Sequence, residues 1–288
     1  MSLLNMLNRA VGKYIPDKLY ICLLYYKNFH IFPDLRRPVT YTEKCQWLKL
    51  NNRISSYSSI ADKVEVKKYI SNIVGEKYTI PTLGIYDSFE SIDFDELPDQ
   101  FVIKCTHDSG GIRICKDKKR FDREEAERFF YRRLKHNYFY DSREYPYKNV
   151  LARLLIEPFY TNKSVGELRD YKFLTFDGIP RIMYVASGRF KHGEQVCFDF
   201  YDMEFRHLEL KNEGFPNAVT PVAKPRYFDE MKEIATKLSK GFPTIRVDFY
   251  ETDDCLYVGE LTFFHEGGMV PFEPSEWDKV LGDWITVI

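Results

Sequence analysis

Two carboxylates stand close together in a segment near the C-terminus that has the pattern of a β-hairpin. The segment 245–268 reads IRVDFYETDDCLYVGELTFFHEGG, with Asp248 on the first predicted strand and Glu260 on the second. Like charges across a ladder repel, and Mg²⁺, which prefers carboxylate and phosphate oxygens, would remove that repulsion. The Gly267–Gly268 pair would let backbone N–H groups approach an anion. The pattern therefore predicts a metal and anion site, with an exposed hairpin of scattered charges as the alternative.

Period-2 alternation sorts the hairpin into a polar and an apolar face. The polar face carries Arg246, Asp248, Glu260 and Thr262. The apolar face carries Val247, Phe249, Leu261 and Phe263. The polar set would therefore meet a ligand from one side while the apolar set enters the core.

A lysine followed by a glycine loop has the composition of a phosphate-binding site. Lys104 lies in the predicted strand FVIKC, and the loop after it contains His107, Asp108, Ser109, Gly110 and Gly111. Glycine permits close backbone approach, and the lysine supplies a compact cation for phosphate oxygens. The loop is not a P-loop, because GxxxxGK[ST] is absent and the lysine precedes the glycines. A strand lysine that extends past a tight turn is the simpler alternative.

A strand end and the strand after it could bind a nucleoside. Glu157-Pro158-Phe159-Tyr160 closes a predicted strand, and Asp170 and Lys172 begin the next. Backbone groups with apolar walls suit adenine, and carboxylates suit ribose hydroxyls. A glutamate on an edge strand is otherwise routine.

Other charged residues carry weaker signals. Lys67 shares a predicted helix with Asp62, Lys63 and Lys68, where intrahelical ion pairs on a solvated face are the simpler interpretation. His107 and His265 lie in glycine-containing loops, and either could be a substrate ligand or a base. No cysteine or serine nucleophile motif surrounds them, and GxSxG and GxGxxG are absent, which disfavours the hydrolase and Rossmann classes.

The elements that must position these residues mix strands and helices without strict βαβ alternation. Helices are predicted over 40–50, 62–73, 122–135, 228–240 and 273–281, after a largely helical first segment, 1–60. Strands are predicted over 79–86, 101–105, 112–115, 154–160, 170–177, 180–187 and 198–201, besides the hairpin. This order favours an α+β fold with largely antiparallel sheets. The division expected is 1–60, 61–160 and 161–288.

Composition excludes several classes of protein. The 288 residues carry a formal net charge of −1, so no global field favours nucleic acid. Six dispersed cysteines without CxxC spacing disfavour zinc and indicate a reducing, cytosolic compartment: Cys22, Cys45, Cys105, Cys115, Cys197 and Cys255.

The N-terminus bears on membrane contact. It lacks the pattern of a secretory signal, and no apolar run reaches the roughly 20 residues of a membrane span. An apolar face of the first helix could rest on a membrane, although packing on the body or a partner is favoured: Leu3, Leu4, Met6, Leu7 and Val11.

Taken in order, these pieces resemble the ATP-grasp superfamily. More closely, about residues 35–285 resemble the TupA-like ATP-grasp family, which is associated with teichuronopeptide and other bacterial surface-polysaccharide synthesis. The stretches that carry the resemblance are TYTEKCQWLKL, ADKVEVKKYI, FVIKCTHDSGG, DYKFLTFDG, LSKGFPTIRVDFY and VGELTFFHEGG. The resemblance implies two α+β lobes with antiparallel sheets that clamp ATP, preceded by a helical N-terminal segment.

The resemblance also implies a role for each site residue. Lys67 and Lys104 would contact the α and β phosphates, and the loop 107–111 would cover the triphosphate. Glu157 and the Pro158–Tyr160 backbone would hold adenine, Asp170 the ribose, and Lys172 would approach phosphate. Asp248 and Glu260 would bind Mg²⁺, with Thr262 in place of the usual asparagine as the weakest ligand. Arg246 and the Gly267–Gly268 backbone would face an acyl phosphate and its tetrahedral successor.

The implied reaction is that of an ATP-dependent carboxylate–amine ligase. A uronic acid of a surface polysaccharide, or of its precursor, would be activated as an acyl phosphate and joined to an amino acid or other amine. The expected setting is the cytoplasm, near polysaccharide-synthesis enzymes, with contact to the inner membrane face left open. A sugar kinase, a glycosyltransferase and a nucleotide-binding scaffold are the alternatives. A glycosyltransferase Asp-x-Asp in a Rossmann-like lobe is absent, and a scaffold has no need of paired carboxylates.

Overall fold

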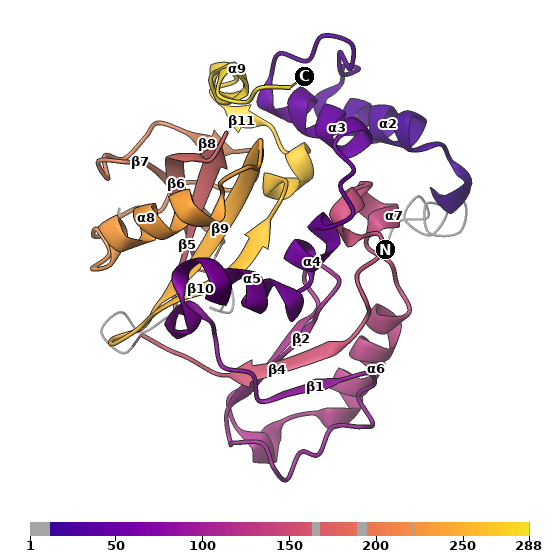
Figure 1. Ribbon diagram of the computed structural model, residues 1–288, viewed down its shortest axis with the longest axis vertical. Helices are drawn as coiled ribbons and strands as arrows, with labels where there is room; N and C mark the ends of the chain where they lie inside the picture. The colour runs from indigo at the N-terminus through magenta and orange to yellow at the C-terminus, as the bar shows by residue number, and fades with distance from the viewer. Residues whose placement is uncertain (1–11, 163–167, 189–194, 221, 288) are drawn as a thin grey trace.

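Two antiparallel sheets stand one above the other in the computed structural model, which describes residues 12–162, 168–188, 195–220 and 222–287 (Figure 1). The smaller sheet has the strand order β1-β4-β2-β3. Its strands are β1 (Gly84–Tyr86), β2 (Phe101–Cys105), β3 (Ile112–Cys115) and β4 (Leu154–Pro158). The predicted apolar face Leu3–Val11 lies outside the described residues.

The larger sheet has the order β10-β9-β5-β6-β7, and every neighbouring pair in it is antiparallel. Its strands are β5 (Asp170–Phe176), β6 (Ile179–Ser187), β7 (Cys197–Asp202), β9 (Thr244–Glu251) and β10 (Leu256–Thr262). A small third sheet pairs β8 (Lys211–Asn212) with β11 (Phe272–Glu273). The predicted α+β class with antiparallel sheets is therefore confirmed, whereas the predicted division of the chain remains a prediction.

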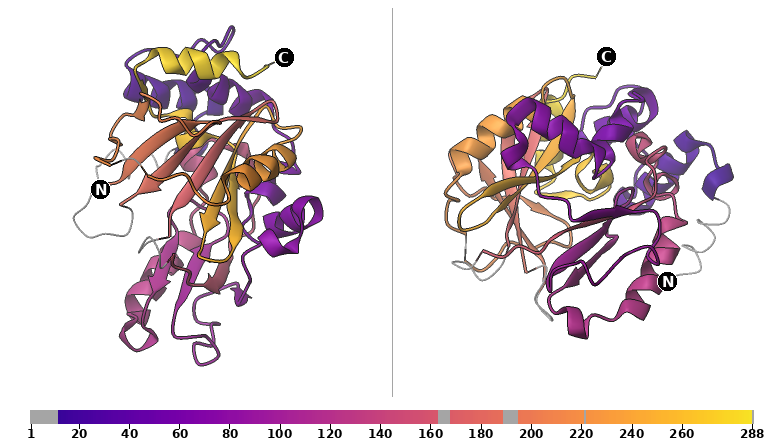
Figure 2. Two further views of the ribbon diagram at one scale, coloured as in Figure 1. Left: turned by 90° about the vertical axis from the view of Figure 1, so that its left-hand side faces the viewer. Right: turned by 60° about the horizontal axis from the view of Figure 1, so that its bottom comes forward.

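Helices cover the sheets and fill their junction, as the two views of Figure 2 also show. In Figure 1, α2 and α3 lie at the upper end beside α9, and α4 and α5 lie where the two sheets meet. The helices are α2 (Asp17–Phe29), α3 (Tyr41–Asn51), α4 (Tyr57–Ala61), α5 (Glu65–Val74), α6 (Arg123–Leu134), α7 (Phe139–Ser142), α8 (Phe228–Leu238) and α9 (Glu276–Asp283). Short 3₁₀ turns connect them: η1 (Gly12–Tyr14), η2 (Glu76–Tyr78), η3 (Lys118–Arg120), η4 (Tyr145–Tyr147) and η5 (His265–Gly268).

Local sequence explains where these helices begin. A capping box begins α3: the Thr40 hydroxyl accepts from the Glu43 N–H, and the Glu43 carboxylate accepts from the Thr40 N–H. Asp122 caps α6 by accepting from the Glu125 N–H at 2.9 Å. Before α5 the carboxylate of Asp62 accepts from the Val64 N–H at 2.8 Å, and the helix starts at Glu65, three residues later than predicted.

Two predicted elements are shorter or shifted because proline interrupts them. The predicted strand 79–86 is reduced to β1, since Pro81 has no N–H to give to a ladder. The predicted helix 273–281 begins instead at Glu276, because Phe272–Glu273 pairs with β8 and Pro274 follows.

Each sheet has its own apolar core. The smaller sheet packs on α6 through a cluster that includes Phe101, Ile103 and Phe130. The larger sheet, α8 and the helices at the junction share a second cluster that includes Phe173, Val247 and Leu238. On β9 and β10 the apolar residues Val247 and Leu261 enter this second cluster, and Asp248 and Glu260 alternate with them. No helix in the described part of the chain is long and apolar enough to cross a membrane.

Candidate active site

A cavity of about 560 Å³ lies between the glycine loop and the acidic hairpin. Its volume is within the range of small-molecule binding sites. The residues predicted from the sequence that line it are Lys104, Asp108, Ser109, Gly110, Gly111, Arg246, Glu260, Thr262 and Gly267. Residues from the smaller sheet and from the larger sheet therefore line the same cavity.

The hairpin has the register that the alternation predicted. Glu260 is directly opposite Asp248, and Thr262 is opposite Arg246. The register shifts between Val258 and Glu260, at Gly259, where a Cβ atom would lie 2.4 Å from the Tyr250 ring. Glycine is therefore required for Tyr250 to lie across this part of the cavity wall.

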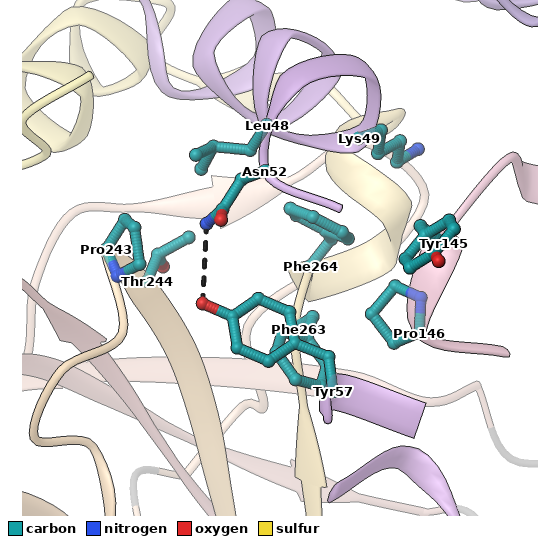
Figure 3. Close-up of a pocket in the computed structure, with 10 residues that line it drawn as sticks. All are labelled: Leu48, Lys49, Asn52, Tyr57, Tyr145, Pro146, Pro243, Thr244, Phe263 and Phe264. Atoms are coloured by element: carbon teal, nitrogen blue, oxygen red, sulfur yellow. Dashed lines mark hydrogen bonds between the residues drawn. The ribbon is translucent and has the colours of Figure 1, made fainter. Parts of the chain in front are cut away.

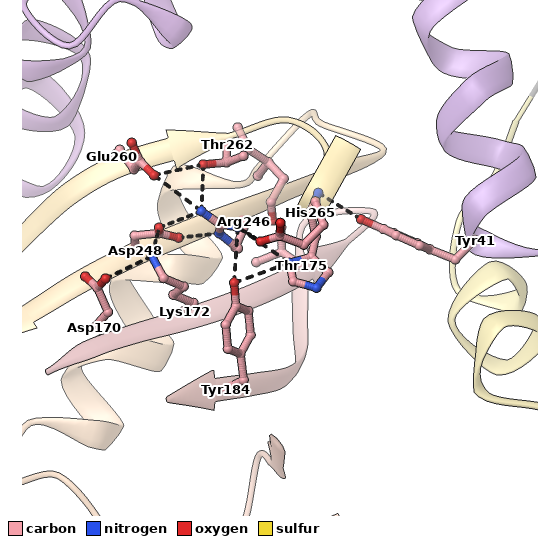
Figure 4. Close-up of polar contacts among 12 residues, drawn as sticks. Tyr41, Asp170, Lys172, Thr175, Tyr184, Arg246, Asp248, Glu260, Thr262 and His265 are labelled. Carbon is pink, nitrogen blue, oxygen red and sulfur yellow. Dashed lines mark hydrogen bonds and ion pairs between the residues drawn. The ribbon is translucent and has the colours of Figure 1, made fainter. Parts of the chain in front are cut away.

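Asp248 is the centre of a buried ionic network on this hairpin (Figure 4). Its Oδ1 accepts from Arg246 Nε at 2.6 Å and its Oδ2 from Arg246 Nη2 at 2.8 Å. The Lys172 ammonium from β5 forms a further short ion pair with Oδ2 and lies 3.5 Å from Asp170. Burial opposes ionisation of Asp248, but the two cations hold the pKa of its carboxyl below the usual value.

Arg246 extends the network to the cavity. Its Nη2 lies 3.3 Å from Glu260 Oε1 and donates to Thr262 Oγ1 at 3.1 Å. Its Nη1 donates to the Tyr184 hydroxyl at 3.2 Å. Despite burial, its acidic partners raise the pKa of Arg246 well above the usual value, so its charge is permanent and its direction is fixed.

The donor set on the hairpin fits Mg²⁺ by its chemistry. Two carboxylates face each other across the ladder with a hydroxyl beside them, and Mg²⁺ is commonly held by one or two carboxylates plus phosphate. Glu260 lines the cavity with a side chain that is 36% exposed, whereas Asp248 lies beneath Arg246 and Lys172. Within the described residues, no three His, Cys, Asp or Glu side chains gather into a metal-binding group.

A second buried network joins the two predicted phosphate lysines. Lys67 and Lys104 each lie 2.7 Å from a different oxygen of Glu157. Burial opposes ionisation of Glu157, yet the two lysines lower the pKa of its carboxyl. Lys67 also donates to the Ile80 carbonyl and the Thr82 hydroxyl at 2.8 Å, so its three N–H donors are engaged and it lies outside the cavity lining. Lys104 lines the cavity and faces the Tyr250 ring at 5.7 Å.

Arg133 of α6 and Lys63 hold the glycine loop in place through Asp108. Asp108 is buried, and its Oδ2 pairs with Arg133 Nη1 of α6 at 3.0 Å. Lys63 donates to the Asp108 carbonyl at 2.7 Å. Gly110 has a φ of +78°, and a Cβ on Gly111 would lie 2.2 Å from Asp108 Oδ1. The backbone conformation therefore favours glycine at position 110, and the close Asp108 side chain requires it at position 111.

The two histidines predicted as possible ligands or bases, His107 and His265, lie outside the cavity lining. His107 is 3% exposed, and its Nε2 lies 3.1 Å from the carbonyls of Arg133 and His136. His265 is 2% exposed, with Nε2 at 2.8 Å from Asn212 Oδ1 and Nδ1 at 3.3 Å from the Tyr184 hydroxyl. Burial, followed by the charge of Arg246, lowers the pKa of His265 well below the usual value. A neutral His265 therefore helps position Arg246.

The turn at Gly267–Gly268 is fixed by two residues of α3 to which the sequence patterns assigned no role. Gln46 Nε2 donates to the Gly268 carbonyl at 2.8 Å, and Lys49 Nζ donates to the Gly267 carbonyl at 2.6 Å. The Gly267 N–H donates to the Phe264 carbonyl at 3.0 Å. Thr42, Gln46 and Lys49 are all buried at i, i+4, i+7 spacing. A polar stripe on the inward face of a helix is the sequence signal that could have revealed them.

Gly268 provides a test of how tightly this turn packs. Its φ is +60°, and a Cβ atom at this position would lie only 2.5 Å from Cys45 Cβ. Gly268→Ala is therefore expected to lower the free energy of unfolding by more than the roughly 1–2 kcal/mol of a left-handed residue alone. Gly241→Ala is the matched control, because φ is +88° there and nothing lies within 4 Å. Urea unfolding of both variants measures the difference, and equal losses would show that the contact with α3 is unimportant.

The predicted adenine and ribose residues lie away from the cavity lining. Pro158 and Phe159 line a separate shallow depression, with the Lys116 ammonium 5.9 Å from the Phe159 ring. The Tyr160 hydroxyl lies 3.4 Å from that of Tyr257 on β10. The remaining predicted residues form the layer behind the lining: Lys67, His107, Glu157, Asp170, Lys172, Asp248 and Gly268.

A smaller cavity lies beside the main cavity, at the C-terminal end of α3 (Figure 3). Its volume is about 10 Å³, enough for one water molecule at most. Asn52 donates to the Tyr57 hydroxyl across it at 3.5 Å. It therefore has no room for a substrate.

Antiparallel α+β sheets that share a chamber between a lysine–glycine loop and an acidic hairpin define an ATP-grasp protein. Residues 43–286 match the family described as TupA-like ATPgrasp, and the chain belongs to this family. The predicted family is confirmed, and membership makes an ATP-dependent ligase the expected class of activity.

Solved structures with similar folds are distant in sequence. D-alanine–D-alanine ligase from Bacillus anthracis, solved with ATP, is 15% identical over 71% of this chain and 55% of its own, with a TM-score of 0.41. The ligase from Helicobacter pylori is 14% identical over 85% and 69%, with a TM-score of 0.46. A RimK domain ATP-grasp protein from Sphaerobacter thermophilus is 12% identical over 81% and 70%, with a TM-score of 0.45.

The chain spans about half the length of the first of these ligases. The ATP-grasp ligase PsnB was solved with Mg and ADP. A search of curated proteins found no match. The family assignment therefore rests on the sequence match over residues 43–286.

Proposed function

We propose that this protein is an ATP-dependent carboxylate–amine ligase that activates a uronic acid of a surface polysaccharide, or of its precursor, and joins it to an amino acid or other amine. The observation that carries the proposal is the single cavity lined by Lys104, the glycine loop, Arg246 and Glu260. Cations and glycine N–H groups at one side suit a triphosphate, and the acidic hairpin at the other suits its metal. The choice of a uronic acid rests on the family resemblance, as do the cytoplasmic setting and the neighbouring polysaccharide enzymes.

Each residue has a defined task in this mechanism. Lys104 and the backbone of the loop 108–111 bind phosphate oxygens and orient the γ-phosphoryl group toward the carboxylate substrate. Asp248 and Glu260, with Thr262, would hold Mg²⁺, which supplies neutralisation of the phosphate charge. Arg246 lies beside them, where it stabilises the negative charge of the acyl phosphate and of the tetrahedral adduct.

The layer behind the lining supports the same site. Glu157 holds Lys104 in place, and Lys172 holds Asp248. We propose that the base and ribose lie toward Glu157–Tyr160 and Asp170. Glu157 acts there mainly through the lysine that it positions.

Nucleotide binding is the first test of this proposal. A ligand present at about 100 times its Kd stabilises the folded state by about 2.7 kcal/mol, so Mg²⁺–ATP is expected to raise the Tm by roughly 5 °C. Differential scanning fluorimetry with ATP, with Mg²⁺ and with both measures the shift. The absence of any shift at millimolar Mg²⁺–ATP would contradict an ATP-grasp active site.

Trapping identifies the reaction. With ATP, a uronic acid and hydroxylamine, the ligase is expected to release ADP and to form a hydroxamate, because hydroxylamine intercepts the acyl phosphate. A sugar kinase would release ADP and leave a stable sugar phosphate instead. Mass spectrometry of the sugar product separates the two outcomes.

A further inference from the structure

Part of the cavity wall comes from residues outside the glycine loop and the strands of the hairpin. This part, called here the acceptor end, is lined by Tyr138, Ser142, Glu144, Tyr147, Phe264 and Glu266. Tyr138, Ser142, Glu144 and Tyr147 lie in or directly before α7 and η4, and the other two precede Gly267. The sequence suggested that Glu266, next to His265, shapes the acceptor pocket, and it assigned no role to Tyr138, Glu144 or Tyr147.

Glu144 is the most unusual group at the acceptor end. It is 2% exposed, yet no Lys, Arg or His of the described residues lies within 4.0 Å of its carboxylate. The Glu144 N–H donates to the Ser142 hydroxyl at 3.3 Å, and burial raises the pKa of the Glu144 carboxyl in spite of the charge of Lys49. The Lys49 ammonium is directed instead to the carbonyls of Ser142 and Gly267, at 3.1 and 2.6 Å. A buried carboxylate without an ion pair gains from a cation that enters the cavity.

The walls around Glu144 also suit a cation. The Tyr138 and Tyr147 rings lie edge to face with centroids 5.0 Å apart, and both line the cavity. Aromatic faces attract ammonium groups. Glu266 adds a second carboxylate, 30% exposed and 3.9 Å from Arg246 Nη1. Asp141, the other acid nearby, is already paired with His136 at 2.6 Å.

Glu144 lies beside the position where the acyl group would react. A Cβ atom on Gly267 would be 3.5 Å from Glu144 Oε1 and 3.8 Å from Lys49 Nζ. In the proposed ligase this turn faces the acyl phosphate, so Glu144 borders the nucleophile's side of the reaction.

We propose that the acceptor end binds the ammonium group of the amine substrate and that Glu144 accepts its proton before attack. This inference rests on the proposed ligase function. The proton passes from R–NH₃⁺ to the Glu144 carboxylate, and the freed lone pair forms the C–N bond to the acyl carbon. The C–O bond to phosphate breaks, phosphate leaves with the electron pair, and the remaining extra proton on nitrogen passes to solvent.

The substitution Glu144→Gln tests this role, because the amide keeps the shape of the side chain but cannot accept a proton. We expect kcat/KM for a panel of amino acids and alkylamines, read as ADP release, to fall by about 100-fold or more. Hydroxylamine is largely uncharged near neutral pH, so hydroxamate formation should stay within a few-fold of wild type. Glu124→Gln, on the exposed face of α6, is the control with unchanged activity.

Equal loss with hydroxylamine and with ammonium substrates would overturn the proposal, since Glu144 would then serve acyl-phosphate formation or the fold. Unchanged amine turnover would overturn it too. If wild-type protein forms no hydroxamate at all, the proposed ligase function fails instead.

A binding measurement keeps the acceptor end testable without turnover. Ethylamine near neutral pH is the probe, and saturation-transfer NMR is expected to show its binding to the wild-type protein. The signal should be lost in Glu144→Gln and weakened in Glu266→Gln. Wild-type protein that does not bind ethylamine, or a Glu144→Gln variant that binds it equally well, would overturn the ammonium site even if the ligase reaction is found.

Discussion

Asp248→Asn is expected to lower turnover by about 100- to 1,000-fold and to lower the free energy of unfolding by about 3–5 kcal/mol. The side chain is fully buried and is the shared anion of Arg246 and Lys172. Its replacement by an amide leaves two buried cations with too little negative charge. The carboxylate proposed for Mg²⁺ is lost at the same time. ADP release and urea unfolding of the same preparation measure the two effects.

Glu260→Gln separates catalysis from stability. Glu260 faces Asp248 across the ladder, but its side chain is 36% exposed and its ion pair with Arg246 is 3.3 Å long. Turnover should fall as in Asp248→Asn while the free energy of unfolding changes little, because exposed ion pairs contribute little. Full activity in both variants would contradict the assignment of this hairpin as the metal site.

Lys104→Met is expected to abolish the Mg²⁺–ATP thermal shift and to lower turnover by about 100-fold. Among the described residues, Glu157 is the carboxylate that pairs with Lys104, and the lysine also lines the cavity. Methionine keeps most of the length of the chain and removes the charge that would meet phosphate. Isothermal titration with ATP and Mg²⁺ measures the loss of affinity directly.

Lys67→Met is the matched comparison, because both lysines pair with Glu157 at 2.7 Å. The donors of Lys67 are already engaged by Glu157, the Ile80 carbonyl and the Thr82 hydroxyl. A phosphate contact would therefore require Lys67 to leave these partners. We expect Lys67→Met to affect stability more than ATP affinity. An equal loss of affinity in both variants would show that Lys67 also reaches the nucleotide.

Local pattern was sufficient for the main helices and strands and for the part of the polar lining that the hairpin and the glycine loop supply. Alternation in 245–263 predicted the face shared by Arg246, Asp248, Glu260 and Thr262, because strand periodicity is a property of the backbone. Turn and cap residues located the helix starts within a few positions. The order of these motifs along the chain then indicated the family.

Tertiary structure decided which charges face the cavity and which face one another. Sequence alone could not show that Glu157 is shared by Lys67 and Lys104, since the three residues come from α5, β2 and β4. It could not show that Gln46 and Lys49 hold the Gly267–Gly268 turn across more than 200 residues of chain.

The local sequence of this protein thus determines the chemistry of each side chain and the strand or helix face on which it lies. Pairing and burial depend on contacts between distant segments, and no short-range pattern encodes them. For that reason only the tertiary structure defines the acceptor end around Glu144, where α7, η4 and η5 meet at one cavity.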